Sequence, residues 1–554
     1  MLLKLDLEKA YDRSRWDFLE DTLKVAGLPG TWVQWIMKCV EGPSMRLLWN
    51  GEKTDAFKPL RGLRQGDPLS PYLFVLCIER LCHLIKSSIA AKKWKPIKIS
   101  QSAPRLSHIC FADDLILFAE ASVDQIRVLR GVLEKFCGAS GQKVSLEKSK
   151  IYFSKNISRD LGKRISEESG MKATKDLGKY LGVPILQKRI NKETFGEVIE
   201  RVSSRLPGWK GRMLSFAGRL TLTKAVLTSI PVHTMSTIKL PQSTLDGLDK
   251  VSRAFLWGST LEKKKQHLVA WTRVCLPRRD GGLGICSATA MNKALIAKVG
   301  WKVLNDGSSL WAQVVRSKYK VGDVHDRNWT VAKSNWSSTW RSVGVGLRDV
   351  IWRGQHWVIG DGRQIRFWTD RWLSETPIAD DSIVPLSPAQ MLCTARDLWR
   401  DGTGWDMSQI APFVTDNKRL DLLAVIVDSV TGAHDRLAWG MTSDGRFTVK
   451  SAFAMLTNDD SPRQDMSSLY GRVWKVQAPE RVWVFLWLVV NQAIMTNFER
   501  KRRHLCDSDV CQVCRGGIES ILHVLRDCPA MSGIWNRIVP RRLQQSFFTM
   551  SLLE

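Results

Sequence analysis

Two adjacent acids, Asp113 and Asp114, have the side-chain type and spacing best suited to chemistry in this sequence. They lie between two short apolar runs, 109–112 and 115–118, and this pattern predicts two strands joined by a tight turn with the acids at its tip. Neighbouring carboxylates repel one another, so they favour either full solvation or a bound cation. Mg²⁺ takes one or two carboxylates and keeps its other positions for water and phosphate oxygens. The stretch therefore indicates a metal site, with a solvated turn as the alternative.

A third acid lies near the start of the chain. Leu3, Leu5 and Leu7 alternate with charged residues, which predicts a half-buried strand from which Asp6 points away from the leucines. Further on, the loop 61–71 combines glycines with basic residues, so its backbone and donors can approach a ligand closely. A plain strand-to-helix connection is the alternative for this loop. Strands and helices alternate in this part of the chain, and the acids fall at strand ends.

Three segments follow one another in the order of polymerase motifs: Leu5-Asp6-Leu7-Glu8-Lys9-Ala10-Tyr11-Asp12, Arg64-Gln65-Gly66-Asp67-Pro68-Leu69-Ser70-Pro71 and Phe111-Ala112-Asp113-Asp114. Together they resemble the palm of the reverse transcriptases of LINE-type (non-LTR) retrotransposons, a kind abundant in plant genomes. Residues 141–149 resemble the motif that follows the palm acids, and residues 180–184 the segment next to the primer. Ser145 departs from the asparagine that this family usually has.

The resemblance implies a catalytic role for four residues. Asp6 and Asp113 would hold two Mg²⁺ ions between the primer end and the incoming nucleotide. Asp114 would complete or orient the site, and Lys148 would donate a proton to the leaving pyrophosphate. Position and charge would carry the catalysis, because phosphoryl transfer needs little covalent chemistry from the protein.

The resemblance also implies how the substrates are held. Tyr11 would stack under the nucleotide sugar and exclude a 2′-hydroxyl, while Gln65 and Gly66 would lie near the template–nucleotide pair, with Arg64 as a further binding residue. The implied partners are an RNA template, a DNA primer or target DNA, and deoxynucleoside triphosphates. Met1 stands five residues before Asp6, whereas the fingers of a right-hand polymerase lie mostly upstream. We therefore expect partial fingers, and a truncated reverse transcriptase that extends a primer poorly.

A non-catalytic, nucleic-acid-binding remnant of such an element is the second hypothesis. Ribonuclease H activity is less favoured, because no further acidic quartet follows the C-terminal cysteines. The charge supports both leading hypotheses: 83 Lys and Arg against 55 Asp and Glu give +28, which predicts a polyanionic partner. Acid-free basic groups occur at 86–98 and at 201–224, the latter with Arg201, Arg205, Lys210, Arg212, Arg219 and Lys224. A solvated basic surface is the alternative.

Four residues near the C-terminal end have metal-ligand spacing: Cys511, Cys514, His523 and Cys528. Two cysteines two positions apart, followed by a histidine and a cysteine, can close a tetrahedral Zn²⁺ site, with His504 and Cys506 as spare candidates. Unrelated buried cysteines are the alternative. The spacing is similar to the zinc-binding module of the same retrotransposon family, which implies one Zn²⁺.

The composition and the resemblance together predict an α+β protein in four parts. These are a right-hand polymerase palm with partial fingers (1–190), a helical thumb-like region (191–290), a Trp-rich connecting region (291–465) and a small zinc-binding module (466–545). The tryptophans of the third part could stack on bases, but a role in filling a small core is favoured. No apolar run approaches a transmembrane length and no signal peptide is present, so we expect an intracellular protein, nuclear or cytoplasmic, that contacts no membrane.

Overall fold

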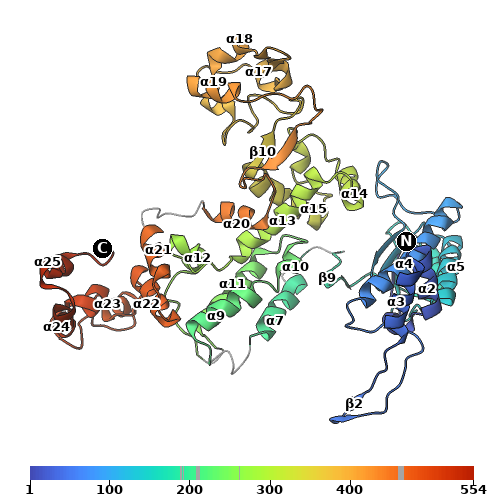
Figure 1. Cartoon of the computed structure of the whole chain (residues 1–554), viewed down its shortest axis with the longest axis horizontal. Helices are drawn as coiled ribbons and strands as arrows, with labels where there is room; N and C mark the ends of the chain where they lie inside the picture. Colours follow the sequence, from blue (N-terminus) through green and yellow to red (C-terminus); the bar gives the residue numbers. More distant parts are fainter. Residues whose placement is uncertain (187–189, 191–192, 207–212, 261–262, 459–466) are drawn as a thin grey trace. The chain divides into compact units, whose positions relative to one another are not determined.

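The computed structural model describes residues 1–554 except 187–189, 191–192, 207–212, 261–262 and 459–466. Lys210 and Arg212 of the predicted basic group therefore lie outside the described residues. The chain divides into two compact units (Figure 1). Unit 1 comprises Met1–Lys188 and Gly307–Asp323, and unit 2 comprises Arg189–Asp306 and Val324–Glu554.

Unit 1 is built on a five-stranded sheet with the strand order β4-β5-β1-β6-β7. Strand β1 pairs antiparallel with β5 on one side and with β6 on the other, while β6 and β7 are parallel. The bounds are β1 (Leu2–Leu5), β4 (His108–Phe111), β5 (Asp114–Phe118), β6 (Lys150–Tyr152) and β7 (Lys172–Ala173). The sequence thus predicted the central strand and the hairpin that follows it.

The turn of the β4–β5 hairpin differs in one detail from the expectation. Ala112 and Asp113 form the two-residue turn, and Ala112 has a positive φ of 50°. Asp114 is the first residue of β5 and pairs with Phe111. Only Asp113 therefore lies at the tip, because a two-residue hairpin turn leaves the next residue in the strand register.

The helices α1 to α6 of unit 1 share an apolar core with this sheet. Ser122 caps α5 by accepting the N–H of Gln125, and Gly141 ends the helix with a φ of 78°. The core joins leucines of β1 and β5 to apolar residues of α2, α4 and α5. The bounds are α1 (Ala10–Arg13), α2 (Trp16–Val25), α3 (Gly30–Glu41), α4 (Ser70–Ala90), α5 (Val123–Ser140), α6 (Arg159–Ser169) and α14 (Leu310–Tyr319).

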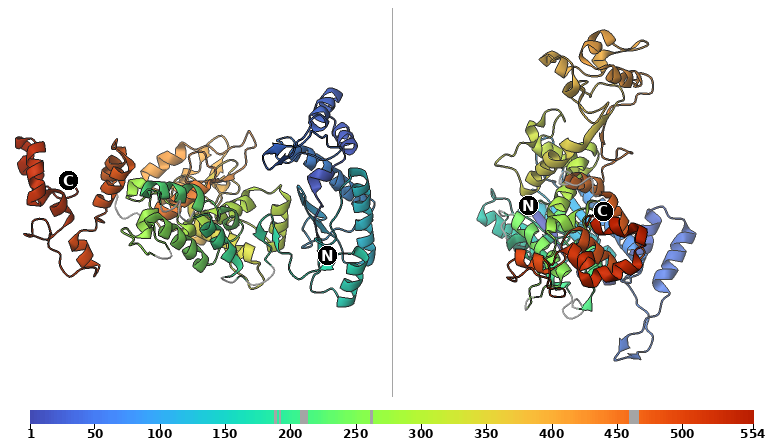
Figure 2. Two further views of the ribbon diagram at one scale, coloured as in Figure 1. Left: turned by 90° about the horizontal axis from the view of Figure 1, so that it is seen from below. Right: turned by 90° about the vertical axis from the view of Figure 1, so that its left-hand side faces the viewer.

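Two small hairpins complete unit 1. The hairpin of β2 (Leu48–Trp49) and β3 (Glu52–Lys53) turns at Asn50 and Gly51, which both have positive φ as a type I′ turn requires. It extends away from the sheet of this unit (Figures 1 and 2). The second hairpin joins β8 (Lys179–Tyr180) to β9 (Val183–Pro184).

Unit 2 is mostly helical. Its strands are β10 (Gln355–Val358), β11 (Trp399–Arg400), β12 (Gly404–Trp405) and β13 (Arg436–Trp439). Its helices are α7 (Gly196–Ser204), α9 (Phe216–Leu222), α10 (Val232–Met235), α11 (Gln242–Trp257), α12 (Trp271–Cys275), α13 (Ala288–Asn305), α15 (Ser338–Gly346), α16 (Trp352–Gly354), α17 (Pro388–Leu392), α18 (Met407–Ile410), α19 (Asp416–Leu423), α20 (Val449–Asn458), α21 (Ser467–Lys475), α22 (Glu480–Val490), α23 (Asn497–Arg502), α24 (Pro529–Ile538) and α25 (Arg541–Thr549).

Tryptophans fill the interior of the middle of unit 2, as the favoured interpretation predicted. Nine of them are at most 9% exposed: Trp329, Trp336, Trp340, Trp352, Trp357, Trp368, Trp372, Trp405 and Trp439. The Gly-Asp-Gly turn at 360–362 and the Asp-Gly turn at 444–445 are of a kind that often joins neighbouring strands. The first turn follows β10, which pairs with the distant β13. At the second turn, the N–H of Trp439 at the end of β13 donates to the carbonyl oxygen of Gly445.

A second core of unit 2 joins segments that are far apart in the sequence. Trp487 of α22 is fully buried among Leu220, Leu256 and Leu283. Its indole N–H also donates to the carbonyl oxygen of Gly281 at 2.9 Å. The helices around 214–285 and the helix α22 therefore share one apolar interior. Among the described residues, no helix is both long enough and apolar enough to span a bilayer.

Candidate active site and metal centre

The sheet register brings the three predicted aspartates of unit 1 to one end of the sheet. Leu5 of β1 pairs with Leu115 of β5, so Asp6 and Asp114 form the next pair in this antiparallel register. Asp113 precedes Asp114 in the hairpin turn. Residues more than a hundred positions apart are thus neighbours.

The charges of these aspartates act on one another. Burial raises the pKa of the Asp114 carboxyl, the carboxylates of Asp113 and Asp6 raise it further, and only Lys4 opposes them. Lys4 is itself engaged, because its ammonium donates to the carbonyl oxygens of Leu177 and Lys179. The three carboxylates therefore form an incompletely neutralised donor set, which suits the oxygen-ligand preference of a divalent cation.

A returning segment fixes the backbone around Asp6. The fully buried Ser149 accepts the Asp6 N–H with its hydroxyl at 3.1 Å, and the Ser145 N–H donates to the Asp6 carbonyl oxygen at 2.8 Å. The Lys148 ammonium lies 3.9 Å from a carboxylate oxygen of Asp6, while its side chain is 76% exposed. The serine that replaces the family's usual asparagine thus still contacts Asp6, and Lys148 is free to reach a ligand.

Tyr11 lies near the acids. Its ring stacks on Phe74 at a centroid distance of 4.7 Å, and its pKa is raised by burial and by the Asp113 carboxylate. Its carbonyl oxygen accepts the N–H of Leu63, which ties the basic loop to this helix. Gly62 is required there, because at its φ of 93° a Cβ would lie 2.8 Å from the backbone of Asp12.

The other residues of the loop 61–71 differ in how far contacts within the protein already engage them. Arg64 donates to the carboxylate of Asp67 at 2.5 Å and to the carbonyl oxygen of Cys39 at 3.1 Å, so its guanidinium is partly engaged by the protein. Gln65 and Gly66 are exposed, and Gly66 has open space around its Cα at a φ of 87°. These two residues are therefore accessible to a ligand, as is the exposed Arg61 of the same loop.

Sequence reasoning placed Ser149 and Tyr180 within motif segments but gave neither of them, nor Lys4, an individual role. The Tyr180 hydroxyl is buried and has no hydrogen-bond partner within the described part of the chain; burial and Asp114 raise its pKa. Lys4 could have been found, because it is two residues before Asp6 on the same face of the strand. The motif at 141–149 does not single out Ser149, because its contact with Asp6 spans 143 positions.

The four predicted zinc ligands of unit 2 converge. The ligand atoms of Cys511, Cys514, His523 and Cys528 all lie within 4.8 Å of one another, and Cys514 Sγ is 3.3 Å from His523 Nε2. Across the described residues this is the one group of three or more such side chains placed to hold a metal ion; the three aspartates converge less closely. His504 is not a member of the group.

Local structure prepares this group for a metal. The backbone N–H of Cys514, more than any other neighbour, lowers the pKa of the Cys511 thiol to about 7. The Cys511 N–H donates to the carbonyl oxygen of Gly517, which closes the loop 511–517 that contains the first two ligands. The N–H of Cys528 donates to the carbonyl oxygen of His523, which joins the second pair. Three thiols and one imidazole in this arrangement are a donor set typical of structural zinc. The spare candidate Cys506 is not part of it.

Two family models match the chain in its two functional regions. Residues 1–185 match the model described as reverse transcriptase (RNA-dependent DNA polymerase). Residues 447–535 match the model described as zinc-binding in reverse transcriptase. These ranges contain the aspartate site and the four metal-binding side chains, respectively.

Several known proteins resemble the chain. A putative ribonuclease H protein of Arabidopsis thaliana is 59% identical over 67% of this chain and 60% of its own length. A retrovirus-related Pol polyprotein from the type-2 retrotransposable element R2DM of Drosophila melanogaster is 35% identical over 26% of this chain and 13% of its own length. An uncharacterised mitochondrial protein of Arabidopsis thaliana is 32% identical over 27% of this chain and 97% of its own length.

The chain thus spans 60% and 13% of the first two of these relatives. The order of the polymerase motifs, their convergence at one sheet end and the two family matches agree with one another. The chain belongs to the reverse transcriptases of the non-LTR retrotransposon type, and it carries their zinc-binding module near its C-terminal end.

Proposed function

We propose that unit 1 catalyses RNA-templated synthesis of DNA. The observation that supports this proposal is the position of Asp6 and Asp114 one residue beyond the Leu5–Leu115 pair, with Asp113 in the adjoining turn, since carboxylates that raise the pKa of one another at one sheet end can bind divalent cations. The substrates would be an RNA template, a DNA primer or target DNA, and deoxynucleoside triphosphates.

In this proposal Asp6 and Asp113 hold two Mg²⁺ ions, and Asp114 completes or orients the site. Two bound ions would activate the primer 3′-hydroxyl and neutralise charge on the reacting phosphates. Lys148, exposed beside Asp6, holds a proton that it can give to the leaving pyrophosphate. The Ser149 hydroxyl accepts the Asp6 N–H and so holds the Asp6 backbone in place.

The remaining residues position the nucleotide. Tyr11, held flat against Phe74, backs the sugar and leaves no room for a 2′-hydroxyl. Gln65 and Gly66 pack against the template–nucleotide pair, and Arg64 joins them only if it leaves Asp67. In unit 2, one Zn²⁺ on the four converged ligands holds the module together and lets it grip RNA or target DNA.

Primer extension tests this function directly. The 554-residue chain is incubated with an RNA template, an annealed DNA primer, nucleotides and Mg²⁺, and is compared with Asp113→Asn. We expect the substitution to lower extension by at least about a hundredfold, because it removes charge from the metal site. Asp160→Asn, an exposed acid in the first turn of α6, is the matched control and should extend like the wild type. Equal extension by Asp113→Asn and the wild type would refute the proposal.

A second candidate function is nucleic-acid binding without turnover, which the formal charge of +28 supports. It predicts that the wild type binds a primed RNA template and shows no extension above the Asp113→Asn level. The same assay, with a binding measurement beside it, therefore separates the two functions.

A further inference from the structure

A small cavity of about 70 Å³ in unit 2 contains two cations that lack acidic partners. It lies between α9, the π-helical turn Thr223–Leu227, the loop that follows α12, and the helices α21 and α22. Its volume is several times the room that one water molecule needs. It can therefore hold a small polyatomic ion.

Lys224 is the first of these cations. Its side chain is half-buried, and the described residues provide no hydrogen bond or ion pair for its ammonium. Burial lowers its pKa, the nearby Arg278 lowers it further, and only the Cys286 thiol opposes them. A Cβ on Gly284 would lie 3.5 Å from the ammonium, so the charge rests close to the backbone of that loop. A cation held in this way lacks the counter-charge that burial normally requires.

Arg278 is the second cation. Its guanidinium lies 4.8 Å from the centroid of the Trp474 ring, and its carbonyl oxygen accepts the Trp474 N–H at 3.1 Å. Within the described residues it makes no ion pair. The aromatic ring therefore orients the guanidinium while leaving its donors available. The side chain of Thr221 also lines the cavity and adds a neutral donor.

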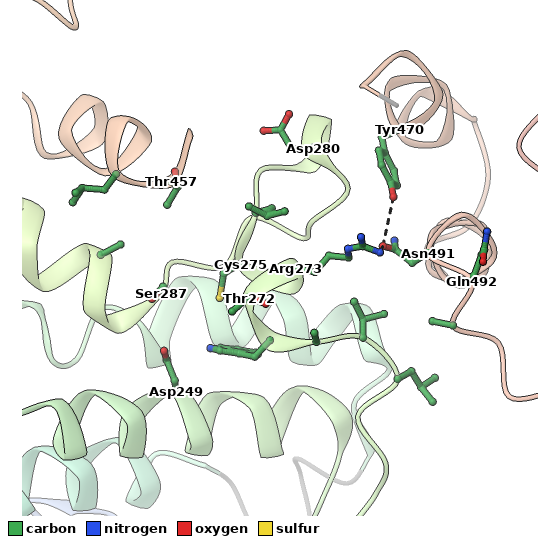
Figure 3. A pocket seen from close by; sticks show the side chains of 18 of the residues that line it. Asp249, Thr272, Arg273, Cys275, Asp280, Ser287, Thr457, Tyr470, Asn491 and Gln492 are labelled. Atoms are coloured by element: carbon green, nitrogen blue, oxygen red, sulfur yellow. Dashed lines mark hydrogen bonds between the residues drawn. The ribbon is translucent and has the colours of Figure 1, made fainter. Parts of the chain in front are cut away.

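A wider cavity of unit 2, of about 840 Å³, is also lined by cations, but these have hydrogen-bond partners within the protein (Figure 3). There Arg273 donates to the side chain of Asn491, which also accepts from Tyr470, and Arg503 donates to the backbone of Leu268. Its cations are thus satisfied by the protein. In the smaller cavity, the half-buried Lys224 has no partner of this kind among the described residues, and the exposed Arg278 makes no ion pair there, so an external anion would supply the counter-charge.

We propose that the cavity formed around Lys224 and Arg278 binds one phosphate group of a nucleic-acid backbone. A phosphate matches it in charge, in size and in its need for several donors. The rim also contains the exposed carboxylate of Glu480, which pairs with neither cation and would weaken the binding of an anion. That the phosphate belongs to nucleic acid rests on the proposed function.

Salt-dependent binding tests this site. The dissociation constant of the full chain for a labelled RNA–DNA duplex is measured at several KCl concentrations, for the wild type, Lys224→Gln and Arg278→Gln. We expect each substitution to weaken binding about fivefold at 0.15 M salt and to reduce the slope of log K against log [salt] by about one. Because both cations contact one phosphate, the double variant should lose little more than either single variant.

Two control variants test whether the change in binding is specific to this cavity. Lys239→Gln removes an exposed cation elsewhere in unit 2 and should leave the slope unchanged. Glu480→Gln removes the acid at the rim and should tighten binding. Unaltered binding and slope in Lys224→Gln and Arg278→Gln would overturn the proposal, as would additive losses in the double variant, since additivity indicates two independent contacts.

A thermal-unfolding series with inorganic phosphate separates the two sources of the anion. If free phosphate stabilises the wild type but not Lys224→Gln, while duplex binding is the same in both, the site is for free phosphate and the nucleic-acid assignment is wrong. A large drop in the unfolding temperature of Lys224→Gln without phosphate would mean that the lysine is structural, which also overturns the site. None of these readouts uses extension, so they stand or fall separately from the polymerase activity.

Discussion

Asp435 of unit 2 makes four backbone hydrogen bonds, and its replacement by alanine should loosen the turn that follows β10. The side chain is 6% exposed. One carboxylate oxygen accepts the N–H groups of Gly360 and Gly362 at 2.7 and 2.9 Å, and the other accepts those of Gln364 and Ile365 at 2.8 and 3.3 Å. One side chain thus satisfies the donors of a whole turn.

The loss of these four hydrogen bonds determines how far the turn is destabilised. A hydrogen bond to a charged acceptor contributes about 1.5–3 kcal/mol, and a buried donor left without a partner costs about 1–3 kcal/mol. Water can enter the space of the missing carboxylate and recover part of this loss. We therefore expect the local opening free energy to fall by about 4 kcal/mol, which corresponds to roughly a thousandfold in the opening equilibrium.

Amide hydrogen exchange of the full chain, followed by mass spectrometry on peptides covering 355–370, measures this effect. Asp435→Asn keeps one oxygen acceptor and should give an intermediate change. Asp416→Ala, which removes an acid whose side chain is 91% exposed, should change nothing. If exchange of the turn in Asp435→Ala stays within about threefold of the wild type, as for an ordinary surface substitution, the reasoning is refuted.

Three further predictions concern the two sites. Ser149→Ala removes the acceptor of the Asp6 N–H and should lower kcat of single-nucleotide extension about tenfold with little change in KM; an unchanged kcat would contradict the anchoring role. Gly62→Ala should lower the unfolding temperature more than Gly66→Ala, because only the first adds a clash, with a Cβ 2.8 Å from Asp12, to a positive φ. Metal analysis should find about one zinc per chain, and a chelator should speed amide exchange across 511–528 but not in unit 1.

Much of the active-site geometry could be predicted because its determinants are local. The leucine alternation around Asp6 and the apolar runs around Asp113 specify strands by themselves, and the family resemblance supplies their order. The sequence placed Lys148 near the acids by the same route, and the structure puts its ammonium close to Asp6. The roles of these residues in catalysis stay predictions until extension is measured.

Other features depend on contacts that no local pattern reveals. The Gly-Asp-Gly sequence at 360–362 is typical of a local hairpin, yet β10 pairs with a strand about 80 residues later, and Asp435 accepts the N–H groups of the turn from that distance. The assignment of Gly307–Asp323 to unit 1 is equally invisible in the sequence. Lys224 was noted only as one member of a basic group, since its partial burial comes from packing. The bounds of the four predicted parts also stay predictions.

The burial of Trp487 limits where this chain can be divided into fragments that fold by themselves. Residues 447–535 match a family model of their own, which invites treating them as a detachable tail. Yet Trp487 closes the interior formed by Leu220, Leu256 and Leu283, and its indole N–H satisfies the Gly281 carbonyl. A polypeptide that ends before residue 447 would expose the apolar side chains of that interior to water and would be prone to aggregate. The start of the zinc-binding family match is therefore not a boundary of folding, because Trp487 completes a core whose buried leucines lie more than two hundred residues earlier in the chain.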